Sequence, residues 1–239
     1  MVSRTQVLGC LYGGALGDGF ASASEHRVGV DASVYEPDWQ LTDDTQLTVA
    51  TCEAIVAASG RVSAEQIAAS LSEAYREGKL TGLGASTLGA LRALSRGGHW
   101  ALSGISGERA AGNGAAMRIA PVALLLDLEE WGDRQTFGDV VRITHKNEEA
   151  LAGAQAQALS IRYLLEHRSP RPEALYAAVA SGMFDSHTRD RLEAMAKAPP
   201  ASYGEAASKI GTSGFAAHSV PVAMVAAMAV IGGEEMEAM

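Results

Sequence analysis

The 239-residue sequence predicts an all-α protein, a compact bundle of many helices. Alanine is abundant and aromatic residues make up only 5% of the chain, a composition that favours closely packed helices. Apolar residues recur at spacings of three and four, whereas the alternating pattern of half-buried strands is scarce. No repeat, low-complexity tract or linker divides the sequence, so a single domain over residues 1–239 is expected.

Local signals set the order and the ends of the expected helices. Glycines at 17 and 19 are expected to end the first helix, and a capping box of Ser63 and Gln66 opens the third. Asn147 is a good cap for a long alanine-rich helix, and Pro170 starts the next one. The last helix is apolar nearly all round and is expected to be central and fully covered. The predicted helices are 5–16, 43–58, 63–78, 86–95, 122–128, 137–143, 147–165, 170–181, 190–197, 203–210 and 219–231.

Charge and composition exclude several classes of function. The formal net charge of −9 argues against a free surface for nucleic acid or an anionic membrane. A small phosphate-bearing ligand is compatible with this charge, because a bound cation inverts the local field. Cys10 and Cys52 fall in apolar helices and are expected to be buried thiols of a reducing compartment. There is no secretory leader, and the longest apolar run is too short for a membrane span, so a soluble cytoplasmic protein is expected.

Residues 41–47, Leu-Thr-Asp-Asp-Thr-Gln-Leu, concentrate oxygen ligands at the start of a helix. Thr42, Asp43 and Asp44 are hard donors that suit Mg²⁺, Mn²⁺ or Ca²⁺ rather than Zn²⁺ or copper. Asp43 or Asp44 would also act as an ordinary N-cap. A metal site and a plain helix cap therefore both stay open on these residues alone.

The connection at residues 20–40 is long, and connections of this length often act as lids. It contains Glu25, for which three interpretations stay open: a third metal ligand, a general acid or base, or a solvated loop residue.

A second informative stretch is Gly112-Asn-Gly-Ala-Ala-Met-Arg118. Gly112 and Gly114 let backbone amides approach a ligand, and the next helix offers free N–H groups to an anion. The stretch is neither a P-loop nor a dinucleotide fingerprint, and a small-residue turn before a core helix would look the same. Arg118 stands alone in an apolar run and is expected to pair with a carboxylate, with a phosphate as the alternative. His145, at the junction before Asn147, is a hydrogen-bonded structural residue or a ligand contact.

Taken in order, four pieces of this sequence resemble the ADP-ribosylglycohydrolase family, the group of dinitrogenase reductase-activating glycohydrolase and its relatives. The pieces are Gly13-Gly-Ala-Leu-Gly-Asp18 with Glu25 beyond it, Leu41-Thr-Asp-Asp-Thr45, Gly112-Asn-Gly-Ala-Ala-Met-Arg-Ile-Ala-Pro121, and Thr144-His145. The resemblance spans essentially the whole chain.

The resemblance implies a compact orthogonal multi-helix bundle of the ADP-ribosylglycohydrolase type, with two Mg²⁺ or Mn²⁺ ions at the base of a cleft. By this resemblance Thr42, Asp43 and Asp44 are the first set of metal ligands. Glu25, Asp43 and Asp44 are the catalytic carboxylates.

The resemblance also implies the ligand and the reaction. Gly112, Asn113, Gly114 and Met117 match the loop that holds the phosphates and ribose of ADP-ribose, and His145 matches a histidine near the ligand. The reaction is hydrolysis of the bond between the ribose anomeric carbon and a protein side chain or small acceptor. ADP-ribose or an ADP-ribosylated protein is therefore the expected partner.

One departure concerns the second set of metal ligands. The family carries a Gly-Gly-Asp-x-Asp-Thr motif near its C-terminus, whereas here Gly232 and Gly233 precede Glu234, and residues 1–239 contain no Asp-x-Asp. The C-terminal part of the fold is therefore expected to be missing, and the second metal site is in doubt. A truncated product, a divergent one-metal member and a relative that binds ADP-ribose without hydrolysis all stay open. The acceptor linkage, the choice of Mg²⁺ or Mn²⁺ and the oligomeric state are open as well.

Overall fold

The computed structural model describes residues 2–24 and 36–233. Within these residues it contains twelve α-helices and two strands of two residues each, so the predicted all-α class is confirmed. The strands are β1 (Ile105–Ser106) and β2 (His145–Lys146), which pair in parallel. Short 3₁₀ turns are η1 (Ser22–Ser24), η3 (Glu108–Ala110) and η4 (Asn113–Ala115). The helices are α1 (Arg4–Ala21), α2 (Asp43–Ala57), α3 (Ala64–Arg76), α4 (Ala85–Ser95), α5 (Trp100–Ser103), α6 (Ala120–Ala123), α7 (Trp131–Arg142), α8 (Glu148–Glu166), α9 (Pro172–Ser181), α10 (His187–Lys197), α11 (Tyr203–Ile210) and α12 (Ala216–Ile231).

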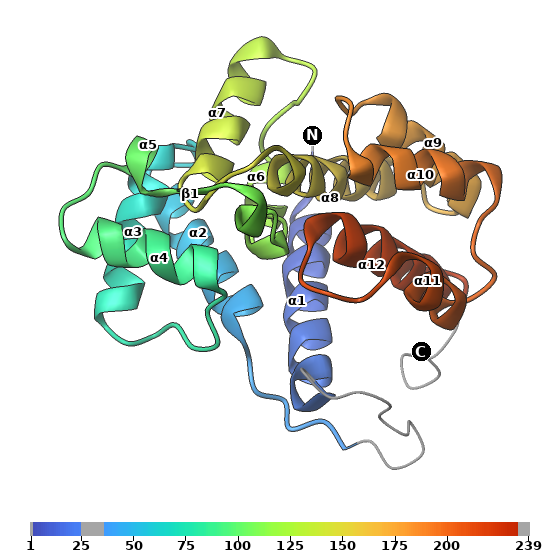
Figure 1. Cartoon of the computed structure of the whole chain (residues 1–239), viewed down its shortest axis with the longest axis horizontal. Helices are drawn as coiled ribbons and strands as arrows, with labels where there is room; N and C mark the ends of the chain where they lie inside the picture. Colours follow the sequence, from blue (N-terminus) through green and yellow to red (C-terminus); the bar gives the residue numbers. More distant parts are fainter. Residues whose placement is uncertain (1, 25–35, 234–239) are drawn as a thin grey trace.

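Helix α8 occupies the centre of the bundle. Helices α2 to α5 lie on one side of it and α9 to α12 on the other (Figure 1), and α8 contacts α6, α7, α9, α10 and α12. Its buried residues are all alanine, glycine or serine, which lets neighbouring helices approach closely. At Gly153 an added Cβ would lie 2.7 Å from the Cβ of Ala216 on α12. The expectation that the last helix is central and fully covered is wrong, because Val230 and Ile231 of α12 are exposed.

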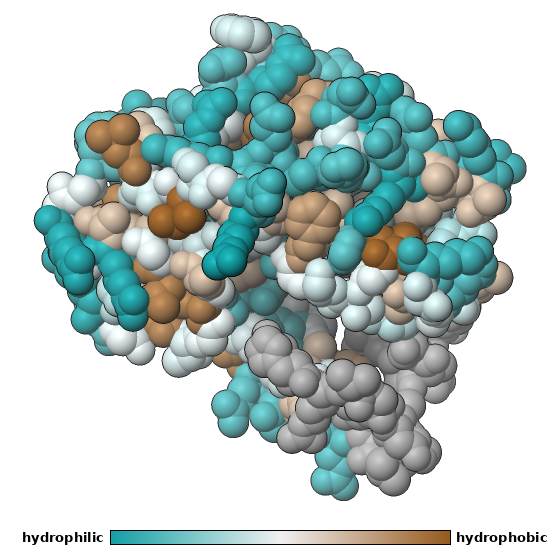
Figure 2. Space-filling model, viewed as in Figure 1, coloured by the Kyte–Doolittle hydropathy of each residue, from teal (hydrophilic) through white to brown (hydrophobic). Residues whose placement is uncertain are grey.

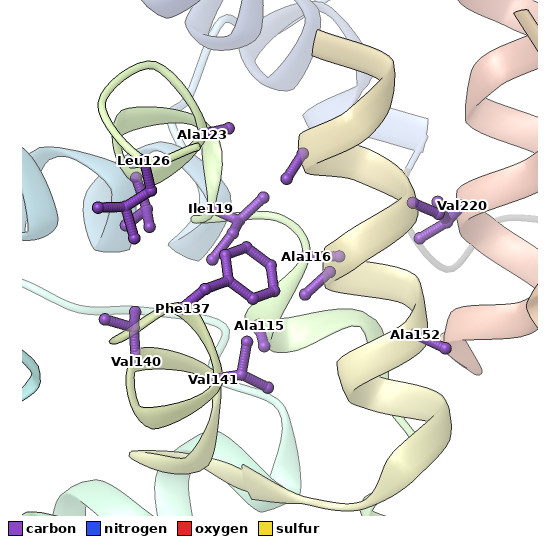
Figure 3. Close-up of a cluster of buried hydrophobic side chains, with 14 of the residues drawn as sticks. Ala115, Ala116, Ile119, Ala123, Leu126, Phe137, Val140, Val141, Ala152 and Val220 are labelled. Atoms are coloured by element: carbon purple, nitrogen blue, oxygen red, sulfur yellow. The ribbon is translucent and has the colours of Figure 1, made fainter. Parts of the chain in front are cut away.

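One part of the buried apolar core lies between α7, the segment around α6, and α8. Figure 3 shows the ring of Phe137 directed toward Ile119, with Ala115 and Ala116 beside it, while Val220 contacts the other side of α8. Phe137 is 2% exposed and Ile119 is fully buried. Truncation of such a phenylalanine to alanine costs about 3–5 kcal/mol, so this cluster holds in place the segment that carries the candidate site.

Several helix ends differ from the predicted ones. Helix α1 continues to Ala21 through the glycines that were expected to end it. The apolar run at 122–128 is helical only to Ala123; on the irregular segment that follows, Leu124 and Leu126 are buried and Leu125 is exposed. Helix α7 begins earlier than predicted, at Trp131, and α10 begins at His187 because Ser186 caps it. In each case tertiary packing or an unnoticed cap set the boundary.

The surface carries no broad apolar area on the face shown in Figure 2, where hydrophobic residues lie in small separate patches among hydrophilic ones. Across the helices at 2–24 and 36–233, none has the length and hydrophobicity needed to cross a bilayer.

Cys10 and Cys52 are free thiols and are half-buried rather than fully buried. Burial raises the pKa of both.

Candidate active site

The first turn of α2 is held by the carboxylate of Asp18, near the end of α1. Asp18 Oδ1 accepts a hydrogen bond from Thr42 Oγ1 at 2.6 Å, and Oδ2 accepts one from the backbone N of Thr42 at 2.9 Å. Oδ2 also accepts from the hydroxyl of Thr45 at 2.5 Å and from its backbone N at 3.3 Å. Four donors and the positive end of the helix dipole therefore converge on one carboxylate. This contact also keeps α1 helical past its glycines.

Thr42 is the N-cap of α2, which corrects the expectation that Asp43 or Asp44 caps it. The Thr42 hydroxyl accepts from the backbone N of Asp44 at 3.4 Å, and both aspartates lie in the first helical turn. Asp43 is 6% exposed, and Asp44 is half-buried. An added Cβ at Gly82 would lie 3.7 Å from Asp43 Oδ1, so the loop after α3 runs against this carboxylate.

Of the three predicted ligands, Thr42 and Asp44 have side-chain oxygens close enough to share one hard cation, and Asp43 lies in the same helical turn. Thr42 Oγ1 lies 3.4 Å from Asp44 Oδ2, and Asp43 lies between these two residues in the chain. Mg²⁺ and Mn²⁺ are commonly held by one or two carboxylates and complete their shell with water. No cluster of three His, Cys, Asp or Glu suited to a metal is found in the ranges 2–24 and 36–233. The metal site at Thr42, Asp43 and Asp44 therefore stays a prediction.

Residues 111–117, the glycine loop, form the second part of the site. The start of α12 holds this loop: the backbone N of Asn113 donates to Gly214 O at 2.9 Å, and Ala216 N donates to Ala111 O at 2.9 Å. Gly112 and Phe215 form an antiparallel bridge between these contacts. Sequence reasoning missed this pairing, because the contacts are made by backbone atoms of a loop with no distinctive residue types.

Gly114 lies between Thr87 of α4 and His145 of β2, with no room for a side chain. An added Cβ would be 2.8 Å from Thr87 Oγ1 and 2.9 Å from His145 Cε1. At Gly112 an added Cβ would be 3.7 Å from His145 Nε2. The two glycines therefore allow a close approach of the loop backbone to the imidazole. Thr87, which the sequence did not single out, is part of this contact.

His145 is 3% exposed and hydrogen-bonds to its neighbour Thr144. Its Nδ1 lies 2.9 Å from Thr144 Oγ1, while the backbone N of Ile105 donates to Thr144 O at 3.1 Å and fixes the strand. Burial, and secondarily the positive charge of Arg118, lowers the pKa of His145 to about 4. The imidazole is therefore neutral at physiological pH.

Arg118 is fully buried, and within the described chain its guanidinium has no carboxylate partner. The expected ion pair is therefore wrong. Arg118 Nη2 donates to Val140 O at 3.0 Å and to Thr144 Oγ1 at 3.0 Å, whereas Nε and Nη1 have no hydrogen-bond partner. Loss of hydration lowers the pKa of Arg118 to about 10, so the side chain stays charged at neutral pH.

Two contacts join the first turn of α2 to the glycine loop. Thr48 Oγ1 lies 2.7 Å from Asp44 O and 3.3 Å from Met117 O. The segment 82–87 passes near both elements, since an added Cβ at Gly82 would lie 3.7 Å from Asp43 Oδ1 and one at Gly114 would lie 2.8 Å from Thr87 Oγ1. The structure thus links the predicted residues at 42–44, 112–117 and 145 through shared neighbours. Glu25 lies outside the described residues, so its role stays a prediction.

A separate hollow lies between α3 and the start of α5. Glu65, Arg76 and Trp100 are among the residues that line it, and none of the predicted site residues does so.

The family described as ADP-ribosylglycohydrolase matches residues 2–238, which is nearly the whole sequence. The chain belongs to the ADP-ribosylglycohydrolase family. Membership confirms the resemblance carried by the four motifs and supports a glycohydrolase-type enzyme. The roles of individual residues in this family member rest on the geometry above and stay predictions.

A solved structure titled ADP-ribosylglycohydrolase-related protein complex is similar to this family member in fold. The TM-score is 0.64 at 24% identity, over 97% of this chain and 77% of that one. This likeness confirms the predicted type of helix bundle.

Two curated relatives match over part of their length. An uncharacterized protein from Archaeoglobus fulgidus is 32% identical over 127 residues, which cover 51% of this chain and 39% of that protein. The uncharacterized protein YegU from Escherichia coli K12 is 26% identical over 193 residues, covering 69% of this chain and 55% of that protein. The match therefore spans about half the length of these relatives.

The substitution Gly114→Ala is expected to destabilise the protein by about 1–3 kcal/mol, because the added methyl overlaps Thr87 and His145 and forces them apart. Urea unfolding measures this change. Gly132→Ala is the matched control, since an added Cβ there meets no described atom within 4 Å and helix propensity favours alanine by up to about 1 kcal/mol. Equal effects of the two substitutions would contradict the close packing at Gly114.

His145 is expected to make stability depend on pH. Its folded pKa of about 4 lies below the ordinary value of 6.5, so between these values the unfolded state binds more protons. The stabilisation is therefore complete above about pH 6.5 and is lost as the pH falls toward 4, with about 2 kcal/mol lost between pH 7 and pH 5. Urea unfolding at these two pH values should show a smaller loss for His145→Gln, which does not titrate. An equal loss in both proteins would refute this assignment.

Proposed function

We propose that this chain is a metal-dependent hydrolase that cleaves the glycosidic bond between ADP-ribose and a protein side chain or small acceptor. Thr42, Asp43 and Asp44 hold Mg²⁺ or Mn²⁺ in this proposal, and the glycine loop binds the phosphates and ribose. The observation that carries it is the contact of both elements with the 82–87 segment, at Asp43 and at Gly114.

The electrostatics of the two elements support an anionic sugar nucleotide. The chain has a net charge of −9, and the first turn of α2 places two carboxylates side by side. Such a site repels a diphosphate unless a cation and neutral donors offset the repulsion. The backbone N–H groups of Asn113, Ala116 and Met117 already bond within the fold, so the remaining amides of the glycine loop, beside an uncharged His145, are the neutral donors that we assign to the anion.

The carboxylates suit the chemistry of an anomeric carbon. Hydrolysis breaks the bond from this carbon to the acceptor atom and forms a bond to the oxygen of water. The water loses a proton and the acceptor gains one. An oxocarbenium-like transition state is stabilised by nearby carboxylates, one of which also takes the proton of the water. We assign these tasks to Asp43 and Asp44, together with Glu25. A bound Mg²⁺ or Mn²⁺ supplies a Lewis acid that orients ribose hydroxyls and acidifies water.

A second candidate function is binding of ADP-ribose or ADP-ribosylated targets without hydrolysis. The residues at 2–24 and 36–233 contain no group of three His, Cys, Asp or Glu that could hold a metal ion. A site that holds a single cation weakly would still bind the ligand through the glycine loop. It would lack the metal's contribution to hydrolysis, so the chemical step would be slow.

Thermal unfolding of the whole chain with MgCl₂, ADP-ribose or both tests the shared part of these proposals. A ligand at 100 times its Kd stabilises the folded state by about 2.7 kcal/mol, so a clear rise in Tm is expected with both present. Asp43→Asn is expected to remove the Mg²⁺-dependent part. Glu77→Gln, which disrupts only the exposed ion pair with Lys79, should keep it. No shift with either ligand would contradict the proposal.

Release of ADP-ribose from ADP-ribosyl-arginine and ADP-ribosyl-serine peptides separates the two functions. Turnover that depends on Mg²⁺ or Mn²⁺ and is lost in Asp43→Asn supports the hydrolase. Binding without turnover on either peptide supports the second candidate.

A further inference from the structure

A buried chain of polar contacts runs from Arg118 through Thr144 to His145 and ends at the glycine loop. Arg118 Nη2 lies 3.0 Å from Thr144 Oγ1, which lies 2.9 Å from His145 Nδ1. All three side chains are at most 3% exposed. The far edge of the imidazole faces Gly112 and Gly114, where added Cβ atoms would lie 3.7 and 3.3 Å from Nε2. These groups have little freedom to rearrange, so their hydrogen atoms can be assigned from the bonds they make.

We propose that Arg118 and Thr144 are positioning residues that fix His145 as a neutral hydrogen-bond donor, with its Nε2–H directed to an oxygen atom of the ligand on the glycine loop. The inference deepens the proposed function and rests on it for the identity of the ligand.

The direction of each hydrogen bond follows from the chemistry of the groups. Arginine has donors and no acceptor, so Nη2 donates both of its hydrogens, one to Val140 O and one to Thr144 Oγ1. Thr144 Oγ1 therefore accepts from Arg118 and keeps its own hydrogen to donate. Among the described residues, the other hydrogen-bond partner of this hydroxyl is His145 Nδ1. Donation to Nδ1 satisfies both buried groups, whereas the reverse direction would leave the hydroxyl hydrogen unpaired.

With Nδ1 as the acceptor, a neutral His145 carries its proton on Nε2. No described group hydrogen-bonds to Nε2. This nitrogen is also absent from the fully enclosed, unpaired side-chain atoms of that part of the chain, which are Arg118 Nε, Arg118 Nη1 and Gln155 Oε1. Nε2 is therefore not fully enclosed, and we infer that a ligand on the neighbouring glycine loop can reach it.

The chain of contacts begins with the positive charge of Arg118, and this charge helps to determine which protonation state of His145 is favoured. A carboxylate at Nδ1 would stabilise an imidazolium and suit the histidine to take a proton. Here burial, and secondarily the Arg118 charge, opposes a second proton and lowers the pKa of His145 to about 4. His145 is thus suited to donate a hydrogen bond to a phosphate or ribose oxygen. It is not suited to act as a base at neutral pH.

The first measurement is the tautomer of His145 by long-range ¹H–¹⁵N NMR of the whole chain labelled with [¹⁵N]histidine. Loss of one ring signal in His145→Gln assigns the residue. The expected result at pH 7 is an unprotonated Nδ1 and a protonated Nε2. A protonated Nδ1 or a charged imidazolium would overturn the inference. In Thr144→Val the ring signals are expected to move toward the average of two exchanging tautomers, and in Thr144→Ser they should stay.

The second measurement is the Kd for ADP-ribose, with Tm as the control for folding. Thr144→Val is expected to weaken binding about tenfold and Thr144→Ser by less than about threefold, because serine keeps the hydroxyl. His145→Gln should bind more tightly than His145→Ala, since a glutamine amide can donate from near the position of Nε2. Equal affinities within either pair would overturn the inference.

The two measurements separate the inference from the proposed function. If the wild-type chain binds no ADP-ribose, the proposed function fails while the tautomer still tests the hydrogen-bond chain. If ADP-ribose binds and the tautomer is the opposite one, the inference alone fails.

Discussion

The candidate site depends first on one carboxylate, Asp18, which ties α1 to the first turn of α2. Its two oxygens accept from the hydroxyl and backbone N–H groups of Thr42 and Thr45. A negative charge at a helix N-terminus is stabilised by the dipole and by charge-assisted hydrogen bonds. The Thr42 hydroxyl donates its hydrogen to Asp18 and accepts from the backbone N of Asp44, so one lone pair remains for a cation. Asp18 thus prepares the ligand set without being one of its members in our account.

The second requirement is close approach between backbones, which the small residues of this chain permit. Gly114 lets the glycine loop lie against Thr87 and His145, and Gly153 lets α12 lie against the central helix α8. The start of α12 then pairs with the loop at Gly112. The alanine and glycine content that predicted the fold class therefore also has a direct part in the site. It lets three segments distant in the sequence meet at one loop.

The sequence was sufficient for most helices and for the motifs, and insufficient for the contacts between them. Capping at Ser63 and Asn147 is local chemistry, and both residues are N-caps as predicted, although of the predicted capping box only the Ser63 half forms. The first helix continues past Gly17 to Ala21, because a tertiary contact at Asp18 outweighs the low helix propensity of glycine. Arg118 was misjudged because its partners, Val140 O and Thr144 Oγ1, lie 22 and 26 residues away and carry no charge. Thr87 and the 214–216 segment contribute by packing against the glycine loop, and no sequence pattern indicates that contact.

The most direct test of the central claim is the affinity of the whole chain for Mn²⁺, measured by electron paramagnetic resonance. We expect the wild type to bind Mn²⁺ and Asp43→Asn, which removes a ligand, to weaken binding by at least about tenfold. We expect a similar loss for Asp18→Asn, which weakens the hold on Thr42, with circular dichroism showing that both variants remain helical. Absence of Mn²⁺ binding by the wild type, or unchanged affinity in both folded variants, would contradict the claim that α2 begins at a cation site.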